Sequence, residues 1–188
     1  MIATMKQEKK IIHPLKFVMY AGCASILMIF AGLSSAYIVK RNQANWIEYD
    51  VPVIFYYSTA VILLSSLTLM LSRKAFIERQ MKHYKTWLFF TVVLGVAFVV
   101  LQYEGFKQLW ESGFTVTRNV SFSFFYVIVG MHALHVAGGV VALFLMYLKS
   151  HSRKRKNYNQ LYIDLMNTYW HFVDILWIYL LVFLIIMD

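Results

Sequence analysis

Residues 122–148 read FSFFYVIVGMHALHVAGGVVALFLMYL and contain no Asp, Glu, Lys or Arg. About 20 consecutive apolar residues make a helix long enough to cross the roughly 30 Å hydrocarbon core of a bilayer. The run is continuously apolar rather than alternating, which favours a helix over a strand of a membrane barrel. Its two histidines, His132 and His135, are therefore expected inside a membrane.

Four further runs share this character, at residues 17–39, 52–71, 86–103 and 169–187. Of the 188 residues, 60% are hydrophobic and 14% are charged, whereas soluble domains average about 45–50% apolar and about 25% charged. The connections are short, and the sequence shows no internal repeat. We therefore predict an all-α integral membrane bundle of five transmembrane helices that forms a single domain over residues 1–188.

The formal net charge of +9 arises from the connections between these runs. Of the 18 Lys and Arg residues, all but Lys40, Arg41, Lys107 and Arg118 lie before the first run, between the second and third, or between the fourth and fifth. Cytoplasmic loops are enriched in Lys and Arg. The pattern predicts a cytoplasmic N-terminus and a C-terminus outside, and it explains the charge without a nucleic-acid partner.

The first run follows a basic segment and contains Ser34-Ser35-Ala36, which resembles a signal-peptide cleavage site. Its apolar length exceeds the about 7–15 residues of a signal peptide, so we expect it to be retained. Cys23 is the single cysteine. No disulfide can form within the chain, and no Cys-x-x-Cys-His motif for covalent haem is present.

Four ionisable side chains fall inside the expected spans, namely His132, His135, His171 and Asp174. Within each span the two are three residues apart and therefore share a helix face. The helical rise of about 1.5 Å per residue places His135 and Asp174 at similar depths on antiparallel helices. If those helices are neighbours, we expect a hydrogen bond between His135 and Asp174.

Ionisable groups are costly in lipid, so each of these four needs a partner or a function. Interhelical hydrogen bonding, a proton relay in a small proton-coupled transporter and haem ligation in a stand-alone cytochrome b are three hypotheses. The hypothesis of haem ligation is weakened because His132 and His135 are too close on one helix to be opposite axial ligands. Against the transporter, the sequence has no repeat and no pair of Gly/Pro-broken helices.

Other residues near the ends of the runs carry weaker expectations. Lys149 either binds an anionic lipid head group or snorkels to the interface. Trp170 is expected in an interfacial aromatic belt. Gly138 and Ala142, four residues apart, are expected to let helices approach closely. Residues 158–166 are expected to extend the fifth span as a helix.

Residues 169–177, YWHFVDILW, resemble the Trp-His-Phe-x-Asp-x-x-Trp signature of the last helix of cytochrome c oxidase subunit III. Trp170 and Trp177 are the two tryptophans of that signature. Residues 130–139, GMHALHVAGG, resemble the Gly-x-His-x-Leu-His-Val-x-x-Gly motif of its penultimate helix. Both motifs are specific, and they occur in the order of that family.

The resemblance continues upstream, with LG at 94–95, then Phe98, Gln102 and Glu104, in the helix before these two. Nearly the whole chain is covered, and it fits the short, five-helix form of the subunit. The resemblance implies a non-redox accessory subunit of a proton-pumping haem–copper oxidase, in which haem and copper are carried by partner subunits. It predicts no catalytic, cofactor-binding or metal-binding residue in this chain.

The same resemblance implies direct contact with oxidase subunit I, assembly with subunit II and the other subunits, and bound phospholipid in a bacterial inner membrane. A place in a larger respiratory supercomplex stays open. The four intramembrane polar residues then become structural or lipid-associated. Cytochrome c is slightly favoured as the electron donor, and subunit III of a quinol oxidase is the alternative.

Two positions depart from the family pattern. Ile26 follows Ser25 where many long members carry a buried Glu, and Lys149 stands where an Arg is often seen at a lipid site. Lysine keeps the charge of arginine but loses the planar fork that grips a phosphate with two hydrogen bonds. The two additional N-terminal helices of the long members have no counterpart in these five runs.

Overall fold

The computed structural model describes residues 13–41, 52–114, 119–151 and 159–187, and these ranges contain no strand. Five helices make up the described chain: α1 (Pro14–Arg41), α2 (Ile54–Ile77), α3 (Met81–Glu111), α4 (Val120–His151) and α5 (Gln160–Met187). All five are long and apolar enough to cross a membrane. The predicted all-α bundle of five membrane-spanning helices is confirmed, while the orientation of its termini stays a prediction.

Every helix extends beyond the run that predicted it, because polar residues at the ends continue the same helical turns. The fifth helix begins at Gln160, nine residues before the expected span. The expected helical extension is thus confirmed from Gln160 onward. At the other end of the chain, α1 starts at Pro14, where a proline costs no hydrogen bond because the first helical N–H has no partner within the helix.

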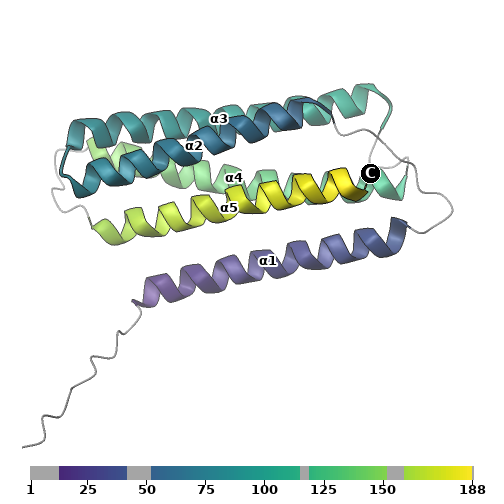
Figure 1. Cartoon of the computed structure of the whole chain (residues 1–188), viewed down its shortest axis with the longest axis horizontal. Helices are drawn as coiled ribbons and strands as arrows, with labels where there is room; N and C mark the ends of the chain where they lie inside the picture. The colour runs from purple at the N-terminus through teal and green to yellow at the C-terminus, as the bar shows by residue number, and fades with distance from the viewer. Residues whose placement is uncertain (1–12, 42–51, 115–118, 152–158, 188) are drawn as a thin grey trace, which may run out of the picture.

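The helices lie side by side along one axis, with α1 at the edge of the bundle (Figure 1). A tight turn joins α2 to α3, where Arg79 adopts a positive φ of 58°. The N–H of Gln80 then bonds back to the carbonyl of Ala75 at 2.9 Å, so the two helices form a closely packed hairpin. Helix α5 packs against α1, α2 and α4, whereas α1 contacts only α4 and α5 among the described helices.

The outer surface of the bundle is apolar. Side chains such as Leu134, Ile175 and Ile186 are each about two-thirds exposed. Soluble monomers rarely expose contiguous apolar surface of this extent. The hydrocarbon of a bilayer is the environment that this surface fits.

Trp170 is fully buried and closely packed against two glycines. A Cβ atom added at Gly95 of α3 would lie 3.0 Å from the Trp170 ring, and one added at Gly139 of α4 would also lie 3.0 Å from it. Only glycine leaves room for the indole at these two positions. The expected close approach at Gly138 is wrong, because a Cβ there would meet no atom within 4 Å.

The two adjacent glycines of α4 provide a matched test. We expect Gly139→Ala to destabilise the protein by about 1–3 kcal/mol, because the new methyl group overpacks against the indole of Trp170. Gly138→Ala should be neutral or stabilise by up to about 1 kcal/mol, since alanine favours the helix and the site is open. Thermal unfolding in detergent, followed by circular dichroism, measures both. Equal effects of the two substitutions would contradict the close packing of Trp170 on Gly139.

Candidate functional site

His132 lies where four helices meet and is completely buried. Its ring stacks on Trp177 of α5, with centroids 5.1 Å apart. The rings of Phe98 from α3 and Phe30 from α1 contact it edge-on at 6.1 and 6.3 Å. Neither ring nitrogen has a hydrogen-bond partner among the described residues. Aromatic rings from three helices thus enclose the imidazole, and this crowding leaves no space for a haem beside it.

His135 is half-buried and, like His132, contacts Phe30 of α1, with 5.9 Å between the ring centroids. Its Nδ1 lies 2.6 Å from the carbonyl oxygen of Met131 in its own helix. The expected hydrogen bond between His135 and Asp174 is wrong: neither carboxyl oxygen of Asp174 has such a partner. The reason is rotational, because His135 faces α1 whereas Asp174 faces α2.

Asp174 forms a small cluster with two side chains on the α2–α5 seam, the line along which helices α2 and α5 pack together. The Oγ of Ser66 lies 2.6 Å from Nδ1 of His171, and the same Nδ1 lies 4.0 Å from Oδ2 of Asp174. Ser66 is also within interaction range of the carboxyl, although no hydrogen bond of good geometry reaches either oxygen. His171 and Asp174 therefore do lie together, as their spacing predicted.

Hydroxyl groups of α2 hold the two signature tryptophans of α5. The Nε1 of Trp170 donates to Oγ of Ser65 at 3.2 Å, and Nε1 of Trp177 donates to Oγ1 of Thr59 at 2.8 Å. Trp170 therefore lies in the core, and its assignment to an interfacial aromatic belt is wrong. Both indoles bury their full surface and pair their only polar atom, which is what the apolar interior requires.

Sequence reasoning missed the three α2 hydroxyls at Thr59, Ser65 and Ser66. A signal was present, since residues 59 and 66 are seven apart and hence on one helix face. Serine and threonine are common in membrane helices, however, and they often bond to their own backbone. Without the position of α5, nothing in the sequence distinguishes these three from Ser25, which bonds to the carbonyl of Ala21.

Gln102 and Glu104 of α3 differ in their surroundings. Gln102 is buried, and its Nε2 donates to Oγ of Ser58 on α2 at 3.1 Å. Glu104, two residues on, is half-buried. Of these two residues, Gln102 alone takes part in a buried polar contact between neighbouring helices.

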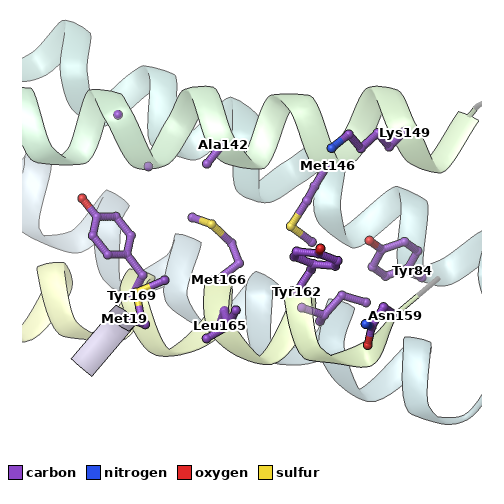
Figure 2. A pocket seen from close by; sticks show the side chains of 13 residues that line it. Met19, Tyr84, Ala142, Met146, Lys149, Asn159, Tyr162, Leu165, Met166 and Tyr169 are labelled. Atoms are coloured by element: carbon purple, nitrogen blue, oxygen red, sulfur yellow. The ribbon is translucent and has the colours of Figure 1, made fainter. Parts of the chain in front are cut away.

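A cleft of about 800 Å³ opens between α4 and α5. Figure 2 shows Lys149, Tyr162 and Asn159 at one end of it and Tyr169 toward the other. Between these ends the lining is small or apolar, including Ala142 and Met166. The cleft is therefore cationic at one end and has an apolar trough along its middle.

The position of Ile26 is apolar as well as uncharged. It is half-buried against the core and lines a second, shallower groove between α1 and α5, next to Cys23. Residue 26 therefore places an apolar side chain, and no carboxylate, on this side of α1.

No metal centre emerges from this arrangement. Within the described ranges, no three His, Cys, Asp or Glu side chains gather as a metal site requires. The intramembrane polar groups occur instead as an isolated imidazole at His132 and a paired imidazole and carboxyl at His171 and Asp174.

The order and content of the last two helices agree with a family model described as cytochrome c oxidase subunit III, which matches residues 45–187. The chain belongs to the cytochrome c oxidase subunit III family. It is 33% identical over 165 residues to a probable cytochrome c oxidase subunit 3 of Nocardia farcinica, covering 82% of this chain and 79% of that one.

Two further subunit III relatives come from the genus Bacillus. The chain is 28% identical over 183 residues to cytochrome c oxidase subunit 3 of Bacillus sp. (strain PS3), which covers 95% of this chain and 86% of the relative. It is 29% identical over 172 residues to that of Bacillus subtilis, which covers 88% and 82% respectively. Because these matches span most of both partners, the five-helix chain is similar to these subunits over most of their length.

Removing one α2 hydroxyl tests its part in holding α5. We expect Thr59→Val to destabilise this subunit III chain by about 1 kcal/mol, because it preserves the shape but leaves the Trp177 N–H without an acceptor. Thr86→Val is the matched control, since Thr86 is exposed and bonds only to Lys82 of its own helix. Thermal unfolding in detergent compares the two. A loss for Thr59→Val no larger than that for Thr86→Val would contradict a role for this hydrogen bond.

Proposed function

We propose that this chain is the non-redox accessory subunit III of a proton-pumping haem–copper oxidase that passes electrons from cytochrome c to oxygen. The family match over residues 45–187 carries the proposal. The surroundings of the intramembrane histidines support it, because His132 is enclosed by aromatic rings and His135 bonds to its own backbone. Haem and copper then belong to the partner subunits.

The partners follow from the same proposal. We expect direct contact with oxidase subunit I, and assembly with subunit II and other subunits, in a bacterial inner membrane with the N-terminus in the cytoplasm. The relatives' names favour cytochrome c over quinol as the donor of the complex. The donor site itself lies outside this chain, so the purified complex has to identify it.

Affinity purification of this chain from its native membrane in mild detergent tests the proposal. We expect larger subunits to co-purify, together with haem and copper, and the preparation to take up oxygen with reduced cytochrome c. A reduced-minus-oxidised spectrum, a copper assay and oxygen uptake with each donor measure this. Uptake with quinol alone would move the chain to the quinol branch, and a colourless chain without partners would favour the transporter.

We propose in addition that the cleft between α4 and α5 binds a phospholipid. Its volume of about 800 Å³ suits part of a large amphiphile. The ammonium group of Lys149 lies at the end where Tyr162 and Asn159 add polar atoms (Figure 2), so the head-group phosphate would lie there. The trough past Met146 and Ala142 is apolar, and it would accommodate an acyl chain.

The charge at Lys149 is the testable part of the lipid site. We expect Lys149→Ala to lower the amount of anionic phospholipid that co-purifies with the complex, because the phosphate loses its cation. Lys82→Ala is the matched control, since Lys82 is exposed at the start of α3 and does not line the cleft. Mass spectrometry of extracted lipid measures both variants. Equal lipid retention in Lys149→Ala and wild type would contradict the site.

A further inference from the structure

The polar residues of α5 follow one seam and stop half-way along the helix. Asp164, His171 and Asp174 are separated by seven and three residues, so they share one face, and that face packs against α2. At the open end Nε of Arg73 donates to Oδ1 of Asp164 at 2.8 Å. Asn167, between Asp164 and His171, adds a buried Oδ1 without a hydrogen-bond partner among the described residues.

The deepest of these three side chains is also the least exposed. The side chains of Asp164 and His171 are 23% and 27% exposed, whereas that of Asp174 is 4% exposed. Ten residues separate Asp164 from Asp174, a rise of about 15 Å, or about half of the hydrocarbon thickness. Asp174 is thus the deepest ionisable group of the seam.

Beyond Asp174 the seam carries no further carboxyl, imidazole or cationic group. The rest of α5 up to Met187 contains none, and neither does α2 from Ile54 to Leu71. The polar atoms of α2 further along are hydroxyls, such as that of Thr59, which is taken up by Phe55 and Trp177. A proton that enters along the seam can therefore reach Asp174, but no carboxyl, imidazole or cationic group of the seam leads from there to the other side of the bundle.

No permanently charged cation of the described residues faces Asp174, and His171, 4.0 Å away, is a cation only when protonated. Arg73, the charged group on the facing side of α2, is paired with Asp164. On α4, His132 is stacked on Trp177 and His135 is bonded to the Met131 carbonyl.

On the remaining neighbours of α5 the titratable groups are also engaged elsewhere. On α1 these are Cys23, which lines the groove beside Tyr169, Tyr37, which packs on Phe183, and Arg41, whose Nη1 donates to Sδ of Met187 at 3.8 Å near the end of α5. On α3, Gly95 and Phe98 contact α5 and are not ionisable, whereas Tyr84 lines the cleft beside the start of α5, away from Asp174. A carboxylate anion at this depth would have no permanent counter-ion, and neither of its oxygens has a hydrogen bond of good geometry, which the apolar interior penalises strongly.

We propose that Asp174 is a one-sided proton-binding site, which holds a proton in the resting protein and exchanges it along the α2–α5 seam through His171. Water enters from the end that carries Arg73 and Asp164, the end expected to face the cytoplasm. His171 is the connecting group, since it lies between Asp164 and Asp174 on this seam and its Nδ1 is 4.0 Å from the carboxyl. Proton transfer runs through the Ser66 hydroxyl, which gives its own proton to Nδ1 of His171 at 2.6 Å as it takes the proton of Asp174, and it leaves a carboxylate beside an imidazolium.

Infrared spectroscopy of the purified oxidase complex, with carbon-13 in the aspartate carboxyl groups, tests the protonation. We expect the wild-type minus Asp174→Asn difference spectrum at neutral pH to contain the carbonyl band of a protonated carboxyl, which shifts in D2O. Asp164→Asn is the matched control on the same helix and should leave that band in place, because Asp164 is paired with Arg73. A difference spectrum that contains only carboxylate bands would overturn the proposal.

A second variant covers failure of Asp174→Asn to assemble. Asp174→Glu keeps the acid, and we expect it to replace the labelled aspartate band by an unlabelled protonated carboxyl band. Ionised glutamate in this variant, together with ionised aspartate in wild type, would also overturn the site.

The exchange route has its own test in the same complex. We expect His171→Leu to slow the D2O-induced shift of the Asp174 band, because the connecting group is lost. Tyr179→Phe is the control, since Tyr179 lies on α5 beyond Asp174 and is exposed. Exchange that stays as fast in His171→Leu as in wild type would refute the route. Neither result bears on whether haem and copper co-purify, so the accessory-subunit proposal is tested independently.

Discussion

The indole of Trp170 is the contact on which the arrangement of α5 depends. It fills the space above Gly95 of α3 and Gly139 of α4, and its N–H reaches Ser65 of α2. One side chain therefore joins α5 to three other helices. Lipid offers helices no hydrophobic incentive to associate, so packing of this kind and interhelical hydrogen bonds have to hold the bundle together. With Trp170 in place, the rotation of α5 turns His171 and Asp174 toward α2 and brings Trp177 onto His132.

The same packing explains where the cleft opens. Trp170 and Tyr169 fill the space at Gly139, but no side chain fills the space at Gly138, and Ala142 is too small to close the gap one turn further on. Helix α1 contacts α4 and α5 among the described helices and borders the cleft with Met19, without filling it. The glycine pair of α4 thus has two functions: Gly139 holds the tryptophan, and Gly138 leaves the trough that ends at Lys149.

The sequence predicts the helices of this fold better than it predicts which side of each helix points into the bundle. Uninterrupted apolar runs sufficed for five helices, and the motifs around His132 and Asp174 sufficed for the family. The partner of His135 and the interfacial place of Trp170 were predicted wrongly, because apolar residues surround every membrane helix and no amphipathic pattern marks the inner side. Depth along an axis follows from the rise per residue, whereas rotation about it depends on contacts such as that of Trp170 with Gly95, which no single run encodes.

The positions of the ionisable groups along α5 also bear on whether the chain could be a proton-coupled transporter. A proton-coupled transporter needs ionisable groups that connect both sides of the membrane, whereas the α2–α5 seam loses its last carboxyl at Asp174 and continues with hydroxyls that are already bonded to Phe55 and Trp177. His132 does not extend the path, because three aromatic rings enclose it. A bundle whose ionisable groups end half-way, with its histidines packed rather than open, is suited to support a catalytic neighbour and unsuited to carry protons across the bilayer alone.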